Sequence, residues 1–108
     1  MPRQVPIDPE KMREHADEAS TLVKALANKQ RLMILCLLVD RERAVGELNG
    51  LLDLSQSALS QHLAVLREEN LVNTRRDGQT IHYSLMDGPA LRILQVLHDT
   101  YCAPSNLE

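Results

Sequence analysis

The centre of this 108-residue chain combines two helical segments, a short turn and a hairpin, in an order that few folds accommodate. Apolar periodicity predicts helices over residues 45–52 and 55–69, and Ser55 is a suitable cap for the second. An Asp77-Gly78 step follows between two β-prone runs, 71–76 and 80–85, and this arrangement predicts a hairpin. Two helices joined by a tight turn and followed directly by a hairpin are typical of a winged helix-turn-helix domain.

Three further helices are expected outside this centre. They run from the Asp8 cap to about residue 27, from the Asn28 cap over about 29–39, and from Pro89 to about 101. The expected fold is therefore mainly α with a small β-hairpin between the fourth and fifth helices. It forms a single domain over residues 8–102, between flexible ends at 1–7 and 103–108. The first and last helices carry more apolar positions than one small domain can cover, so we expect a homodimer that pairs through them.

Composition and charge exclude several classes of protein. The formal net charge of −3 argues against nucleic-acid binding by electrostatic attraction alone, so DNA affinity must come from a few well-placed contacts. No apolar run approaches the length of a membrane span and no signal peptide is recognisable, so a cytoplasmic protein is expected, with no membrane partner. There is no phosphate-binding glycine loop and no nucleophile with a base, so neither catalytic residues nor a cofactor are predicted.

The helix predicted over residues 55–69 has two contrasting faces. Helical spacing places Leu59, Leu63 and Leu66 toward the core. The opposite face is small, polar and neutral, which suits insertion into the major groove of double-stranded operator DNA. His62 lies on the flank, where a DNA contact and simple packing are equally open. The candidate DNA-binding residues of this helix are Gln56, Ser57, Ser60, Gln61 and His62.

Four cationic side chains are further candidates for DNA contacts. Arg75 and Arg76 of the hairpin are placed to meet phosphates or the minor groove. Because strand side chains alternate between faces, ordinary strand-edge charge remains an open reading for one of these two. Lys29 and Arg31, together with the amides at the start of the second helix, suggest a further phosphate site.

The segment from Leu54 to Arg67, LSQSALSQHLAVLR, resembles the recognition segment of the ArsR/SmtB repressors. Residues 26–35 and 45–48 are also similar to that family, and the resemblance covers about residues 15–102. It implies a dimer of winged helix-turn-helix subunits, paired through the first and last helices, that releases DNA when an inducer binds.

Many proteins of that family sense metals, and here the sequence departs from the pattern. The third helix has no Cys-x-Cys motif, and Pro89 and Thr100 stand where the family's other metal site would need imidazoles. His98, Asp99 and Cys102 are possible ligands but do not make a convincing tetrahedral set. No metal site is therefore predicted, although a metal-responsive repressor remains an alternative.

The two cysteines, Cys36 and Cys102, instead match the positions found in the sulfide- and redox-responsive branch of the family. The resemblance implies that reactive sulfur species or oxidants act as inducer and form a disulfide or polysulfide link. Burial in an apolar helix should disfavour the Cys36 thiolate, so Cys102 is expected to react first.

Three alternatives remain open for the two cysteines and for the chain. Cys36 could be an ordinary core residue and Cys102 an idle surface thiol. The chain could relieve silencing at virulence genes without sensing thiols. It could also be a protein-interaction module that has lost DNA binding.

Overall fold

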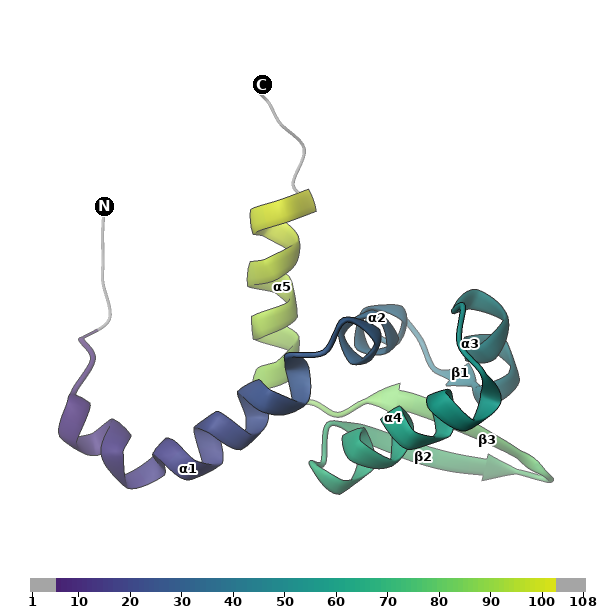
Figure 1. Ribbon diagram of the computed structural model, residues 1–108, viewed down its shortest axis with the longest axis horizontal. Helices are drawn as coiled ribbons and strands as arrows, with labels where there is room; N and C mark the ends of the chain where they lie inside the picture. The colour runs from purple at the N-terminus through teal and green to yellow at the C-terminus, as the bar shows by residue number, and fades with distance from the viewer. Residues whose placement is uncertain (1–5, 103–108) are drawn as a thin grey trace.

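The computed structural model describes residues 6–102 and forms a winged helix-turn-helix, as the sequence predicts (Figure 1). Over these residues the chain forms five helices and a small antiparallel sheet whose strand order is β1-β3-β2. The elements are, in chain order, α1 (Pro9–Leu26), α2 (Lys29–Leu37), β1 (Arg43–Ala44), α3 (Val45–Leu51), α4 (Gln56–Glu68), β2 (Val72–Asp77), β3 (Thr80–Leu85) and α5 (Pro89–Cys102).

Three predicted N-caps begin the helices where the sequence placed them. The Asp8 carboxylate accepts from the backbone N–H of Glu10 at 3.0 Å, and the Asn28 side chain accepts from that of Gln30, also at 3.0 Å. The Ser55 hydroxyl accepts from the N–H of Ala58 at 3.1 Å. Each cap satisfies an amide that the helix cannot pair internally, and this fixes where the helix begins.

The core is aliphatic and lies between the helices and the sheet. The predicted inner face of α4 is confirmed, because Leu59, Leu63 and Leu66 are all buried. They pack in one cluster with buried side chains of α2, α3, β3 and α5, including Ile34, Leu35, Leu48, Tyr83 and Leu94. This cluster holds α4 by its apolar side and leaves its polar side exposed.

Two backbone features shape the wing, one where it follows α4 and one at its tip. Asn70 adopts a left-handed conformation with φ of 58°, and the N–H of Leu71 donates to the carbonyl of Leu66 at 2.9 Å. This bond closes the end of α4 and directs the chain into β2. At the tip of the wing Gly78 has φ of 65°, a conformation that glycine adopts without the steric cost other residues meet. The predicted Asp-Gly hairpin is thereby confirmed, as the pairing of Asp77 with Thr80 shows.

The structure corrects two expectations at the end of α2. The helix ends at Leu37 and not near Val39, and the segment after it contains a short strand that the sequence does not predict. Arg43 and Ala44 form β1 and pair with Tyr83 and His82 of β3. A two-residue strand carries no periodicity of its own, and this one exists because β3 lies beside it.

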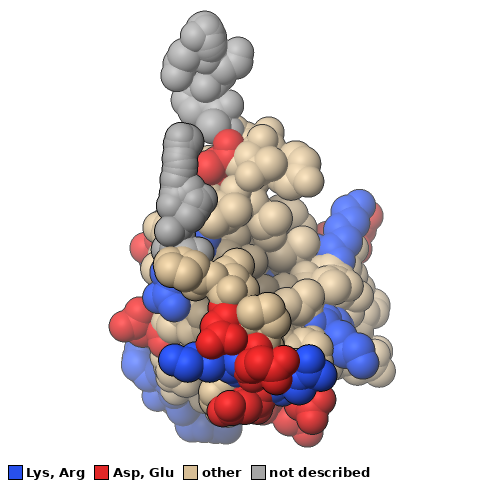
Figure 2. All heavy atoms as spheres, turned by 90° about the vertical axis from the view of Figure 1, so that its left-hand side faces the viewer, with Lys and Arg blue, Asp and Glu red and all other residues tan. Residues whose placement is uncertain are grey.

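Helices α1 and α5 extend away from the body of the domain (Figure 1). Met12 and Val23 on α1, and Val96 and Tyr101 on α5, are large apolar side chains that the single chain leaves exposed. Figure 2 views this side: uncharged side chains dominate over α5 in the upper part, and charged ones crowd over α1 below. Within residues 6–102, no helix has both the length and the apolar character that crossing a bilayer would require.

Candidate DNA-reading surface and thiol pair

The outer face of α4 is a polar, uncharged surface near the start of the helix. Gln56, Ser57, Ser60 and Gln61 are all exposed there. His62 is half-buried, in agreement with its predicted place on the flank. Small hydroxyls and amides offer both donors and acceptors to base edges, so this surface has the chemistry that major-groove reading requires.

The turn before α4 is fixed by a side chain of α3. The Asn49 amide donates to the carbonyl of Leu54 at 3.0 Å, one residue before the Ser55 cap. At the far end of α4, the Arg67 guanidinium donates to the hydroxyl of buried Tyr83 at 2.5 Å. Both ends of α4 are thus held by polar contacts in addition to the buried leucines.

Arg31 links three helices from its place in the first turn of α2. Its Nε donates to the carbonyl of Ala25 at 2.7 Å and its Nη2 to that of Lys24 at 3.3 Å, at the end of α1. Its Nη1 lies 3.4 Å from Nδ1 of His62 on α4. Sequence reasoning placed Arg31 at a phosphate and had no signal for these contacts, which engage the guanidinium within the chain.

The other candidate cations differ in how free they are. Lys29 is exposed, and the Asn28 cap already occupies the N–H groups of Gln30 and Arg31 beside it. In the wing, Arg76 pairs across the hairpin with Ile81 and is exposed.

Arg75 forms a bidentate ion pair with Glu42, at 2.6 and 3.1 Å. The hydrogen bond from Arg75 lowers the pKa of Glu42, and the same contact raises the pKa of Arg75. The ion pair joins the wing to the segment before β1, a contact that the sequence did not predict.

The two cysteines lie on neighbouring helices and are free thiols. The predicted burial of Cys36 is wrong for the single chain, because its side chain is exposed; the run 32–38 is not covered all round. The expected effect on its pKa is nevertheless confirmed. The surrounding atoms and, to a smaller extent, the Cys102 thiol raise the pKa of Cys36.

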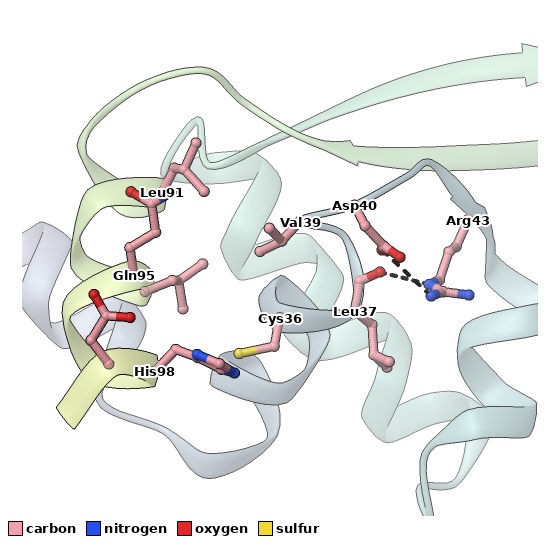
Figure 3. A pocket seen from close by; sticks show the side chains of 10 residues that line it. Cys36, Leu37, Val39, Asp40, Arg43, Leu91, Gln95 and His98 are labelled. Atoms are coloured by element: carbon pink, nitrogen blue, oxygen red, sulfur yellow. Dashed lines mark hydrogen bonds and ion pairs between the residues drawn. The ribbon is translucent and has the colours of Figure 1, made fainter. Parts of the chain in front are cut away.

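A cavity of about 420 Å³ lies between α2 and α5, and we call it the α2–α5 cavity (Figure 3). Cys36 and Leu37 line it from α2, and Leu94, Gln95 and His98 line it from α5. The rest of its wall is Val39, Asp40, Arg43, Leu91 and Asp99. In Figure 3 the Cys36 thiol and the His98 imidazole point toward one another across this space.

The possible metal ligands of α5 do not gather into a site. Over residues 6–102, no three side chains of His, Cys, Asp or Glu lie close enough together to hold a metal ion. His98, Asp99 and Cys102, which the metal-responsive alternative would use, are included in that range.

Comparison with known proteins identifies relatives that cover most of the chain. Residues 28–74 match the family described as bacterial regulatory protein, arsR family. The transcriptional activator HlyU of Vibrio cholerae serotype O1 is 48% identical over 97 residues, which cover 90% of this chain and 90% of HlyU. The biofilm growth-associated repressor of Agrobacterium fabrum is 44% identical over 93 residues, which cover 86% of this chain and 80% of the repressor.

Solved structures agree with the fold. Reduced HlyU from Vibrio cholerae superimposes with a TM-score of 0.81 at 49% identity, covering 86% of this chain and 98% of that one. A homodimeric winged helix-turn-helix DNA-binding domain from Mycobacterium bovis matches with a TM-score of 0.73 at 28% identity, covering 90% of this chain and 89% of that one.

Proposed function

The chain belongs to the arsR family of bacterial regulatory proteins, and on that premise we propose that a sulfur link between Cys36 and Cys102 switches its affinity for operator DNA. Its relatives are transcriptional regulators and not enzymes, and the chain is likewise a DNA-binding transcriptional regulator. The observation that carries the proposal is the placement of the two thiols on neighbouring helices: Cys36 lines the cavity between α2 and α5, and Cys102 ends α5. The inducer is a reactive sulfur species or another oxidant of thiols.

Operator DNA is read by the exposed face of α4. Gln61 is suited to pair bidentately with adenine, and Gln56, Ser57 and Ser60 reach bases or phosphates beside it. Arg76 and Lys29 are the exposed cations that meet the DNA backbone. Arg75, Arg31 and His62 are secondary candidates, since each already has a partner within the chain.

A second copy of the chain covers α1 and α5. The exposed apolar side chains on these helices, among them Val23 and Val96, require burial that the single chain does not provide. The homodimeric relative from Mycobacterium bovis supports this arrangement. A dimer carries two α4 helices, which must lie about 34–36 Å apart to enter successive major grooves.

The link would act on the DNA through α2. Cys36 lies near the end of this helix, and Arg31 in its first turn holds both α1 and His62 of α4. Linking Cys36 to α5 therefore changes the position of α2 relative to α4, which reads DNA, and relative to α1 and α5, which pair the subunits. A coupling free energy of about 1–3 kcal/mol, or 5- to 150-fold in affinity, is enough for such a switch.

The order of reaction follows from the environments of the two thiols. Both thiols are exposed, but the pKa of Cys36 is raised, so Cys102 at the end of α5 reacts first. Cys36, whose pKa is raised, then resolves the product. A direct disulfide requires Cα atoms within about 7 Å, whereas a bridge of several sulfurs spans a wider gap. The separation of α2 and α5 therefore selects which oxidant the protein reads.

Mass spectrometry of peptides tests whether the link forms. The protein is treated with a sulfide donor or with peroxide, and we expect a peptide pair that joins Cys36 to Cys102, with its mass giving the number of sulfurs. Cys36→Ser and Cys102→Ser should each abolish both this species and the change in operator affinity. A full DNA response in either variant would contradict the proposal and leave a regulator that does not sense thiols.

A further inference from the structure

His98 lies where it can serve both cysteines. It lines the α2–α5 cavity together with Cys36, and Figure 3 shows its imidazole directed at the Cys36 thiol. It also precedes Cys102 on α5 by four residues, a spacing that brings two side chains to the same face of a helix. Within the described residues, no side-chain hydrogen bond occupies the ring nitrogens of His98. The side chain is exposed, so its ring nitrogens are accessible.

Cys36 must lose its thiol proton before it can react at neutral pH. Surrounding atoms, and then Cys102, raise the pKa of its thiol, so the thiol stays protonated where a free cysteine would already be partly ionised. The thiolate is the nucleophile in sulfur exchange, and a protonated Cys36 would resolve a modified Cys102 slowly. A proton acceptor beside Cys36 removes this obstacle.

We propose that His98 is the proton acceptor that activates Cys36, and that it thereby speeds closure of the sulfur link near neutral pH. The inference rests on the proposed function in one respect: it takes Cys36 to be the resolving thiol. No other neutral base lines the α2–α5 cavity among the described residues.

The charged groups around the cavity leave this role to His98. Arg43 faces the opposite side, where its Nε donates to the Leu37 carbonyl at 2.6 Å and its guanidinium pairs with Glu47 at 2.7 Å and with Asp40 at 3.6 Å. Arg43 is therefore committed to other partners. Asp99, the residue after His98 on α5, adds a carboxylate to the wall of the cavity.

The reaction balances with an organic trisulfide, R–S–S–S–R, as oxidant. The Cys102 thiolate attacks the central sulfur, and one R–S⁻ leaves to give the mixed trisulfide Cys102–Sγ–S–S–R, which carries one inserted sulfur. Neutral His98 then takes the proton of Cys36, and the resulting thiolate attacks the inserted sulfur and displaces the second R–S⁻. The imidazolium returns its proton to this leaving group. The two thiols are oxidised to a trisulfide link, and the oxidant is reduced to two R–SH.

Alkylation of a single thiol tests the role of His98 without requiring a link or DNA. In the Cys102→Ser background, the rate at which iodoacetamide modifies Cys36 is measured from pH 6 to pH 10. We expect His98→Gln to slow this rate by about tenfold near pH 7, at the lower edge of what a positioned base contributes. The difference should vanish near pH 10, where hydroxide ionises the thiol without His98.

Gln95→Ala is the matched control, because it removes a side chain from the same wall of the cavity but no titratable group. Its pH profile should follow that of the parent. A pH-independent slowing in His98→Gln would mean that His98 only shapes the cavity, and an unchanged rate would mean that it has no role; either result overturns the inference. Thermal unfolding of each variant checks that the fold is intact.

A second rate separates this inference from the proposed function. In the chain with both cysteines, dimethyl trisulfide should form the Cys36–Cys102 link more slowly in His98→Gln than in the parent, again only below pH about 9. If the link forms in the parent and more slowly in His98→Gln, but DNA affinity does not change, the proposed switch is refuted and the role of His98 stands. If DNA affinity changes on linking, and the rate of link formation has the same pH profile in the parent and in His98→Gln, only the role of His98 is refuted.

Discussion

The α4 reading surface and the α2–α5 cavity are built in opposite ways. α4 is capped at its start, closed at its end and held underneath by three buried leucines, and its outer face has no carboxylate before Glu68. Around the cavity the thiols are exposed, the space is open, and α5 makes only sparse contacts with the rest of the chain. A rigid surface suits the reading of a fixed sequence, and a loosely packed seam suits a switch, because weakly held elements move at low cost.

Leu63→Ala tests how firmly α4 is held and should have the largest effect. Leu63 is 2% exposed within the core, so its truncation should lower the free energy of unfolding by about 2–5 kcal/mol, measured by urea denaturation. Ser60→Ala, one turn away on the exposed face, should change it by less than about 0.5 kcal/mol. Similar values for the two variants would mean that α4 is not anchored by this face.

Replacing Ser57, Ser60 and Gln61 together by Ala tests the reading surface itself. Each good base contact is worth about 1–3 kcal/mol, so operator affinity should fall at least about tenfold in an anisotropy titration. Unfolding should be nearly unchanged, since all three side chains are exposed. Unaltered promoter occupancy would instead favour a protein-interaction module.

Arg31→Ala and Lys29→Ala separate an internal contact from a DNA contact within one helical turn. Arg31 loses a hydrogen bond of 2.7 Å to the Ala25 carbonyl, and we expect a loss of about 1–3 kcal/mol in the free energy of unfolding. Lys29 is exposed, so its removal should leave the free energy of unfolding unchanged. It should reduce the number of ions released on DNA binding, read from the slope of affinity against salt, by about one. The reverse pattern would assign Arg31 to the DNA and Lys29 to the fold.

Glu42→Gln sharpens the comparison at the wing and should have the smallest effect. Releasing Arg75 from its ion pair frees a cation for the DNA backbone, so operator affinity should rise a few-fold at low salt. The lowered pKa of Glu42 means that the pair stabilises the fold above the usual carboxyl pKa and that this contribution disappears as the pH falls through the lowered value. A decrease in affinity would show that Glu42 instead positions the wing.

Local signals in the sequence account for most of the fold and for the face of α4. The caps Asp8, Asn28 and Ser55 and the Asp77-Gly78 turn each depend on neighbours within a few residues, and such neighbours are visible in the sequence. The 3.6-residue apolar period of α4 is equally local in the sequence, and the three leucines that it places on the inner face, Leu59, Leu63 and Leu66, are buried.

The remaining features depend on residues that are distant in the chain. β1 exists because Tyr83 and His82 lie beside it, and the partners of Arg31 and Arg75 include residues 31 and 33 positions away. Cys36 illustrates the limit best: its apolar surroundings in sequence predicted burial, but α5 leaves a cavity over it. Only the packing of α5 against α2 decides this, and no local pattern encodes that packing.

Operator affinity of the linked and the reduced protein tests the central claim most directly. The species carrying one Cys36–Cys102 link per chain is purified, verified by mass, and titrated against operator DNA beside the reduced dimer at one salt concentration. The switch predicts affinities that differ by about 5- to 150-fold, with the reduced value restored by dithiothreitol. Equal affinities for the two species would contradict it.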